Sequence, residues 1–271
     1  MIRDFDEAYA NSAFIADGAS YPDSWAAAAL AMRANLPDGC RAEIDIGYGP
    51  NPRNRMDLFL PATAPKGLCV FIHGGYWMAF GKADWSHLAR GALLRGWAVA
   101  VPEYTLAPQV TIGAITGEVA RAITAAATLV AGPIRLAGHS AGGHLACRMV
   151  CNPSQLPEAV VARVEHVTSI SGLHDLRPLM LTAMNDTLKL TELEARNESP
   201  ALRRPIAGAR VTCWVGADER PEFIRQSRLL ANIWHGLGVY TDLHVAAGRH
   251  HFNVIADLAD PDTALSQNVA P

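Results

Sequence analysis

The 271-residue chain has no run of lysines and arginines, and its formal net charge is −3. Proteins that bind nucleic acid or anionic membranes usually carry a basic patch, so neither partner is expected. No segment has the length and apolarity of a membrane span, and the alanine-rich residues 26–31 are far too short for one. The start is acidic and lacks the basic and then apolar pattern of a secretory signal.

Cysteine, dinucleotide and metal motifs are also missing. The five cysteines are an odd, scattered set without Cys-x-x-Cys, which indicates free thiols in a reducing compartment, so the cytoplasm is the expected location. No Gly-x-Gly-x-x-Gly opens the first predicted βα unit, so no dinucleotide cofactor is expected. His250 and His251 are adjacent, which is not a metal-ligand spacing, and no metal site is expected either.

What the chain does have is the composition and pattern of an α/β protein. Half of its residues are hydrophobic and 18% are charged. From residue 40 onward, apolar runs alternate with amphipathic segments, which predicts a mostly parallel central sheet with helices on both faces. The expected strands are 41–47, 56–60, 68–72, 97–101, 133–137, 164–170, 211–215 and 240–246. The expected helices are 86–95, 117–130, 143–150, 221–236 and a final helix that starts over 251–258.

The alternation is broken once, over residues 173–208. This stretch is polar, contains three prolines and has a helical patch around 188–196. A break of this length late in a sheet is typical of a small cap inserted over a site. We therefore expect a single domain over residues 1–271, with an N-terminal segment 1–40 and a cap or lid at 173–208.

Residues 138–142 read Gly-His-Ser-Ala-Gly, between a predicted strand and a predicted helix. Gly-x-Ser-x-Gly in this setting is the nucleophile elbow, a cramped turn that presents a serine above the sheet. The sequence thus predicts Ser140 as a nucleophile at a helix N-terminus, where free N–H groups favour developing negative charge.

A second candidate element, His73-Gly74-Gly75-Tyr76-Trp77, follows the predicted strand 68–72. Two glycines there let the backbone approach a ligand, so the N–H groups of Gly74 and Gly75 are predicted to form an oxyanion hole with that of Ala141. Tyr76 and Trp77 are candidate substrate-binding residues, although for Trp77 packing in the core is an equally good interpretation.

The base and the acid are expected after the last two strands, because serine, acid and then histidine is the chain order of such hydrolases. The base is His250 or His251, and the acid is Asp218 or Glu219, two carboxylates that spacing alone does not separate. His73, His139 and His144 are interpreted as packing or loop-fixing residues.

Several motifs together resemble the kynurenine formamidases (arylformamidases) and related esterases and lipases with an HGG oxyanion loop, all α/β-hydrolases. The resemblance runs over residues 44–260, and the matching stretches are 73–77, 103–108, 138–145, 171–176, 215–223 and 251–252. It implies a triad at Ser140, position 219 and His251. The formamidases have Asp at the position of Glu219, whereas this sequence has Glu there and Asp one residue earlier, so Glu219 is favoured over Asp218.

The leading hypothesis is therefore a serine hydrolase that cleaves a small acyl amide or ester by an acyl-enzyme mechanism, with N-formylkynurenine-like formamides as first substrates. A general short-chain carboxylesterase is the alternative, and a non-catalytic binding protein on the same fold is the third. The expected partner is a small molecule, and a homodimer is the assembly left open.

Overall fold

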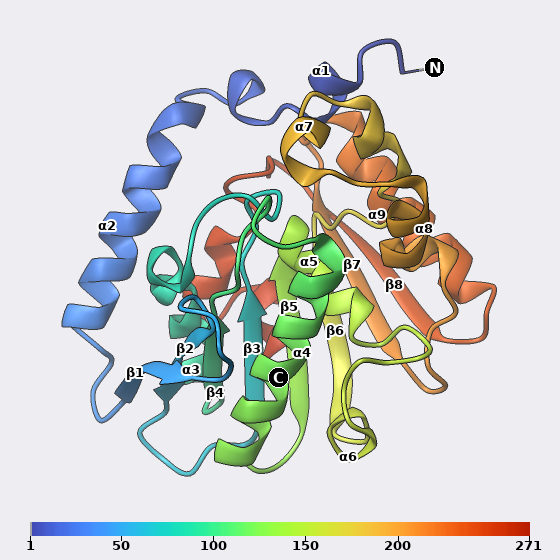
Figure 1. Ribbon diagram of the computed structural model, residues 1–271. Coiled ribbons are helices and arrows are strands. Elements are labelled where there is room, and N and C mark those ends of the chain that lie inside the picture. The colour runs from blue at the N-terminus through green and yellow to red at the C-terminus, as the bar shows by residue number, and fades with distance from the viewer. Residues whose placement is uncertain (1) are drawn as a thin grey trace.

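The computed structural model describes residues 2–271 and contains one sheet of eight strands (Figure 1). Their order is β1-β2-β4-β3-β5-β6-β7-β8. The β1–β2 and β2–β4 pairs are antiparallel, and the pairs that follow are parallel. The strands are β1 (Arg41–Gly47), β2 (Arg55–Leu60), β3 (Leu68–Ile72), β4 (Ala98–Pro102), β5 (Ile134–His139), β6 (Val164–Ile170), β7 (Arg210–Gly216) and β8 (Tyr240–Ala246). All eight lie within two residues of their predicted bounds, so the mostly parallel sheet is confirmed.

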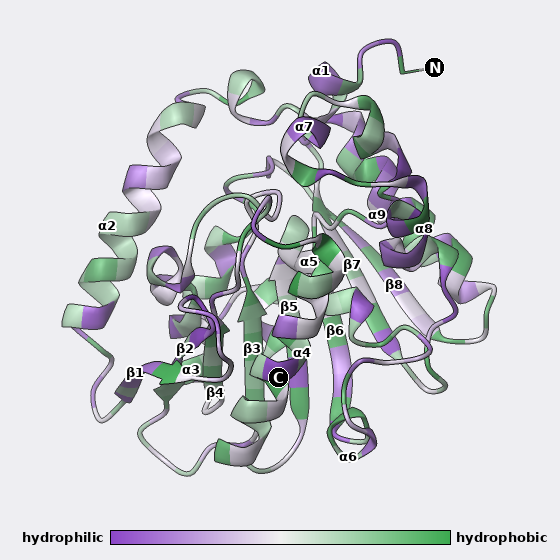
Figure 2. Cartoon of the chain, in the orientation of Figure 1, coloured by the Kyte–Doolittle hydropathy of each residue, from purple (hydrophilic) through white to green (hydrophobic). Residues whose placement is uncertain are grey.

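Helices cover both faces of this sheet, as predicted. Successive side chains of a strand point to opposite faces. In β3, Leu68, Val70 and Ile72 belong to the hydrophobic core that includes α4 (Ile112–Leu129), α5 (Ala141–Arg148) and α9 (Pro221–His235). Cys69 and Phe71 belong to a second core, which includes α3 (Arg90–Leu94) and α10 (Ala264–Val269). Figure 2 shows β3 as hydrophobic along its length, whereas the edge strand β8 is paler.

The N-terminal residues form helices that the sequence analysis did not assign. These are α1 (Phe5–Tyr9) and α2 (Tyr21–Ala34), joined by two short 3-10 turns. Buried residues of α2 are Trp25, Ala29 and Met32, an i, i+4, i+7 spacing that is typical of a helix packed on one side. In Figure 1 the chain passes over the top of the molecule from α1, beside α7, to α2. We call residues 5–20 the N-terminal strap.

Residues 173–208 contain α7 (Asn185–Leu188) and α8 (Glu192–Glu198), flanked by 3-10 turns at Arg177–Leu181 and Pro200–Leu202. Several leucines of segment 173–208, such as Leu176, Leu179 and Leu188, are buried in the hydrophobic core that also contains residues of α4 and α9. The short α6 (Glu158–Val161) lies before β6. Among the described residues, no helix is both long enough and apolar enough to cross a membrane.

One predicted helix is wrong. Residues 251–255 form turns, followed by a 3-10 helix at Ala256–Ala259, and the last α-helix starts only at Ala264. Side chains compete with helical bonding here: the ring Nδ1 of His250 accepts the N–H of Phe252, and Asn253 accepts the N–H of His250. The predicted helix 86–95 is likewise divided into a 3-10 turn at Ser86–Ala89 and the short α3.

Candidate active site

Ser140 stands at a sharp turn between β5 and α5. Its backbone has φ 55° and ψ −117°, in a region that non-glycine residues rarely adopt, and its side chain borders a cavity. A Cβ atom at Gly138 would lie 2.1 Å from the carbonyl oxygen of Gly142, and one at Gly142 would lie 1.9 Å from that of Ile72. Only glycine fits at both positions, so the surrounding packing imposes the strained serine.

The glycine loop after β3 lies directly against this serine. A Cβ atom at Gly74 would be 3.1 Å from the Cβ of Ser140. Gly75 has φ +106°, and a Cβ there would be 2.5 Å from the carbonyl oxygen of Ala79. Within residues 2–271, the N–H groups of Gly74, Gly75 and Ala141 donate to no protein acceptor. The loop and the elbow thus bring free donors to the neighbourhood of one hydroxyl.

His251 and Glu219 are buried and in contact. Nδ1 of His251 lies 2.7 Å from Oε2 of Glu219. The other carboxylate oxygen, Oε1, accepts the N–H of Gly216 at 2.8 Å and the hydroxyl of Ser171. A carboxylate fixed by three partners orients the imidazole and stabilises its protonated form.

The neighbouring candidates take other positions. Asp218 is exposed, and its backbone N–H donates to the carbonyl of Arg249. His250 is half-buried, with Nε2 3.2 Å from the hydroxyl of Tyr21, and burial lowers its pKa. Of each adjacent pair, it is therefore Glu219 and His251 that the structure brings together.

Two further histidines support this arrangement. Nε2 of His139 donates to the carbonyl of His251 at 2.9 Å, and burial holds the pKa of His139 well below its usual value. His73 stacks on Tyr104 with ring centroids 4.2 Å apart, and burial lowers its pKa to about 4. Both side chains are thus neutral near pH 7 and fix the backbone of the two loops.

A cavity of about 450 Å³ opens beside Ser140 and His251. Gly74, Gly75 and His139 border it as well. Much of the remaining lining is aromatic, from Tyr9, Trp25, Tyr76, Phe80, Trp85 and Phe252. Such a volume with predominantly apolar walls and a few polar groups suits a small molecule that contains an aromatic ring.

The expectation for Tyr76 and Trp77 needs one correction. Tyr76 borders the cavity, but the indole of Trp77 is 0% exposed and packs edge-on against His144 in the core. Both residues have positive φ, so the turn sends the two adjacent side chains in different directions. Trp77 is a core residue, which was one of its two interpretations.

The N-terminal strap contributes residues to the cavity that the sequence analysis missed. Five of the lining residues lie within it, whereas segment 173–208 contributes Met184 alone. The strap residues are Asp6, Tyr9, Ala10, Asn11 and Ser12. Trp25 of α2 also borders the cavity, and it forms an aromatic pair four residues apart with Tyr21, with ring centroids 5.6 Å apart, which was a usable signal for α2 but not for the strap.

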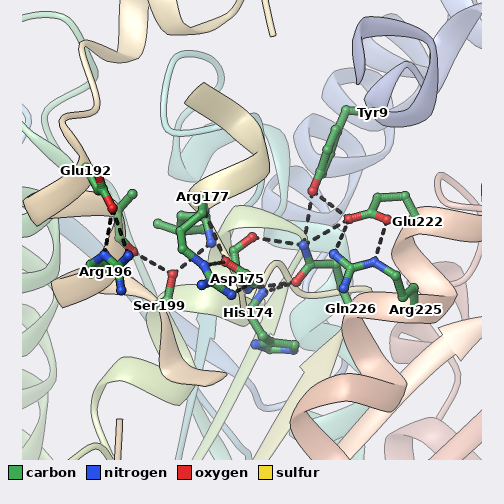
Figure 3. Close-up of polar contacts among 12 residues, drawn as sticks. Tyr9, His174, Asp175, Arg177, Glu192, Arg196, Ser199, Glu222, Arg225 and Gln226 are labelled. Carbon is green, nitrogen blue, oxygen red and sulfur yellow. Dashed lines mark hydrogen bonds and ion pairs between the residues drawn. The ribbon is translucent and has the colours of Figure 1, made fainter. Parts of the chain in front are cut away.

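Tyr9 anchors the strap to α9. Its hydroxyl donates to Oε1 of Glu222 at 2.6 Å and accepts from Nε2 of Gln226 at 3.1 Å. Figure 3 shows this contact and its continuation from Gln226 to Asp175. Tyr76 adds a second anchor, because its hydroxyl donates to the carbonyl of Tyr9.

The first turn of α9 joins this anchor to the catalytic candidates. Phe223, the residue after Glu222, packs on the ring of His251 with centroids 4.3 Å apart. In the part of the chain that the structure describes, no three His, Cys, Asp or Glu side chains converge as metal ligands would.

Comparison with known proteins adds three findings. The BD-FAE family matches residues 56–224. Kynurenine formamidase of Danio rerio is 28% identical over 234 residues, which cover 83% of this chain and 79% of that protein. Kynurenine formamidase of Drosophila melanogaster is 28% identical over 243 residues, with 84% and 76% covered.

Solved structures share the fold. A protein of Silicibacter sp. TM1040, provisionally described as a thioesterase, is 49% identical with a TM-score of 0.93, and the match covers 98% of this chain and 99% of that one. An esterase of Pyrobaculum calidifontis is 19% identical with a TM-score of 0.68, with 93% and 94% covered. The second likeness concerns the fold alone, and this fold is the α/β-hydrolase fold.

Proposed function

The chain belongs to the BD-FAE family, and from this membership we propose that Ser140, His251 and Glu219 form the catalytic triad of a serine hydrolase. The protein is a hydrolytic enzyme of the formamidase and esterase type. The observation that carries the proposal for the triad is the 2.7 Å contact between His251 and Glu219, on a cavity that Ser140 also borders.

In the first step, Oγ of Ser140 attacks the carbonyl carbon of the substrate while Nε2 of His251 takes the hydroxyl proton. Glu219 accepts the hydrogen bond from Nδ1 and stabilises the imidazolium that forms. The carbonyl oxygen becomes negative and is held by the N–H groups of Gly74, Gly75 and Ala141. Loss of one such donor typically slows a reaction about 100- to 1,000-fold.

In the second step, the imidazolium of His251 gives its proton to the leaving nitrogen or oxygen. The C–N or C–O bond breaks, and the acyl group stays on Ser140 as an ester. Water then attacks this ester and gives a proton to His251, which passes it to the serine oxygen as the acid leaves.

The proposed substrates are aryl formamides, with the formyl group at Ser140 and the ring in the cavity, where Tyr76 is a substrate-binding residue. The aromatic lining and the likeness to kynurenine formamidases support this choice. The test compares deformylation of N-formylkynurenine with hydrolysis of p-nitrophenyl acetate by the purified protein. Ester turnover without detectable deformylation would contradict the formamidase proposal.

A short-chain carboxylesterase is the alternative that such a result would support. The 49% identity to a protein provisionally described as a thioesterase is a reason to include an aryl thioester in the same comparison. All three substrates would use the same serine, so the ratio of their kcat/KM values separates the activities.

The nucleophile is tested independently of the substrate with a fluorophosphonate probe, which labels activated serines. We expect labelling of the wild-type protein and none of Ser140→Ala. The control is Ser227→Ala, because Ser227 is buried outside the cavity lining. Equal labelling of wild type and Ser140→Ala would remove the assignment of the nucleophile, and absence of labelling in the wild type would favour a non-catalytic binding protein.

We also propose that the chain acts as one domain, with residues 173–208 and the strap together covering the cavity. A cytoplasmic location is proposed because all five cysteines are free thiols, as a reducing compartment favours. Fractionation of cells tests the location, and light scattering tests whether the protein forms a homodimer.

A further inference from the structure

Each oxyanion donor of the glycine loop is one half of a peptide unit, and the other half is a carbonyl. The N–H of Gly74 shares its peptide with the carbonyl of His73, and the N–H of Gly75 shares its peptide with the carbonyl of Gly74. The atoms of a peptide unit lie close to one plane, so a group that fixes the carbonyl oxygen also fixes the direction of the N–H. The hydrogen-bond partners of these two carbonyls therefore influence the oxyanion hole from behind.

Tyr104 binds the first of these carbonyls. Its hydroxyl donates to the carbonyl oxygen of His73 at 3.0 Å, and its ring stacks on the imidazole of His73 with an interplanar angle of 8°. Tyr104 is 0% exposed and lies outside the cavity lining, and burial raises the pKa of its hydroxyl well above the usual value. The hydroxyl therefore keeps its proton and holds this peptide without touching a substrate.

The ring of His73 binds the second carbonyl. Its Nδ1 lies 2.8 Å from the carbonyl oxygen of Gly74. A carbonyl oxygen can only accept, so Nδ1 carries the ring proton and donates it to this bond. Burial lowers the pKa of His73 to about 4, so near pH 7 the ring is neutral and this hydrogen bond determines its tautomer.

Contacts on the other side of Tyr104 hold it against the glycine loop. Nε of Arg53 donates to the carbonyl of Tyr104 at 2.9 Å, and Nη2 donates to the carbonyl of Phe80 at 2.5 Å. Arg53 thus joins the tyrosine to the end of the same loop. A Cβ atom at Gly142 would lie 2.7 Å from the carbonyl oxygen of His73. This oxygen is therefore enclosed between the elbow and the tyrosine hydroxyl.

We propose that Tyr104 and His73 are positioning residues, which aim and polarise the first two N–H groups of the oxyanion hole through the carbonyls of the same peptides. This inference rests on the hydrolase function proposed above and adds two residues to it. A hydrogen bond to a carbonyl oxygen makes the N–H of that peptide a stronger donor. Donors that are already aligned need no reorganisation when the substrate oxygen becomes negative. Loss of the alignment should weaken binding of the transition state more than binding of the substrate.

The first test is Tyr104→Phe, which removes the hydroxyl and keeps the ring that stacks on His73. For p-nitrophenyl acetate, we expect kcat and kcat/KM both to fall about tenfold while KM stays within about twofold of wild type, as for an interaction made only in the transition state.

The matched control is Tyr48→Phe. The hydroxyl of Tyr48 also donates to a backbone carbonyl, that of Glu103, one residue before Tyr104, and Tyr48 lies outside the cavity lining. Both variants should unfold at lower urea concentration than the wild type, because each loses a hydrogen bond. The fall in kcat is expected in Tyr104→Phe alone, with Tyr48→Phe within about twofold of wild type.

Two variants of His73 test the second peptide. Asparagine has an amide nitrogen close to the position of the imidazole Nδ1 and can still donate to the carbonyl of Gly74, whereas alanine cannot. His73→Ala should lower kcat about 100-fold, and His73→Asn should recover about tenfold of this loss. If the two variants are equally slow, the inference is wrong, whether or not Tyr104→Phe folds.

Inhibitors separate binding of the transition state from binding of the aromatic ring. With phenylboronic acid, Oγ of Ser140 bonds to boron and the serine proton moves to His251, which leaves a negative tetrahedral adduct with an oxygen for the oxyanion hole. Its inhibition constant should rise about tenfold in Tyr104→Phe, whereas that of phenol should stay within about twofold.

Equal changes for both inhibitors, or a kcat of Tyr104→Phe equal to that of Tyr48→Phe, would overturn the inference. Failure of the proposed function would appear differently, because the wild-type protein itself would then show neither hydrolysis nor labelling by the fluorophosphonate probe.

Discussion

At the scale of single residues, the carboxylate of Glu219 has three partners, and that of its neighbour Asp218 is exposed. Glu219→Ala should therefore lower kcat/KM for p-nitrophenyl acetate about 10³- to 10⁴-fold, because the imidazole loses its orientation and its countercharge. Asp218→Ala is the matched control, and its kcat/KM should stay within about twofold of wild type, as for most exposed positions. The opposite ranking would transfer the role of the acid to Asp218.

These residues differ in how far the sequence could predict them. Ser140, Gly74 and Gly75 follow from short motifs, because the turns that they form are determined by local sequence. The choice between Asp218 and Glu219 depends on which of the two side chains points into the protein. Their loop passes very close to Arg249, because a Cβ atom at Gly216 would lie 2.1 Å from the carbonyl oxygen of Arg249. Such an approach between distant segments is a tertiary feature that spacing along the chain does not contain.

At the scale of elements, the hydroxyl of Tyr9 links the strap to α9 as both donor and acceptor. Tyr9→Phe removes the bonds to Glu222 and Gln226 but keeps the ring that packs on Phe223. We expect the free energy of unfolding to fall by about 1–3 kcal/mol, because a buried carboxylate and a buried amide each lose a partner. KM should rise more than kcat falls, because the strap lines the cavity. Urea unfolding and steady-state kinetics measure the two effects.

Tyr240→Phe is the control for this change, because Tyr240 is 57% exposed on the edge strand β8 and lies outside the cavity lining. Both its stability and its KM should remain close to wild type. A Tyr9→Phe protein with reduced stability but unchanged KM would show that the strap supports the fold without shaping the site.

The elements themselves were predictable in proportion to the strength of their patterns. The central strands β3 and β4 follow from continuous apolar runs, because strands covered on both faces must be apolar throughout, whereas the edge strands β1 and β8 were predicted although most of their residues are not buried. The strap was not predicted, because α1 has five residues and its position depends on Tyr9, Glu222 and Tyr76, which are distant in sequence. The final helix was placed too early, because polar side chains at 250 and 253 bind the backbone that a helix would need.

At the scale of the whole molecule, five buried histidines couple stability to pH. Burial lowers their pKa values, to about 4 for His73 and His166, to about 3 for His144 and His174, and well below 6.5 for His139. Between pH 6.5 and 4 the unfolded chain therefore binds more protons than the folded one, so stability is complete above pH 6.5 and falls with pH below it. Burial raises the pKa of Glu103, which has the opposite effect on the pH dependence of stability, but this is one carboxyl group against five histidines.

This coupling predicts acid unfolding well above the range in which carboxylates titrate. Each histidine contributes up to about 1.4 kcal/mol per pH unit, against a typical total stability of about 5–15 kcal/mol. The midpoint of thermal unfolding should thus fall steeply from pH 6.5 to pH 4.5.

His166→Gln removes one of these groups at a site remote from the cavity lining, where its ring contacts the hydroxyl of Thr212. It should make the dependence of the free energy of unfolding on pH shallower by about one proton. His235→Gln changes an exposed histidine at the end of α9 and should leave the slope unchanged. A midpoint that stays constant from pH 7 to pH 5 would mean that these histidines accept protons without unfolding the protein.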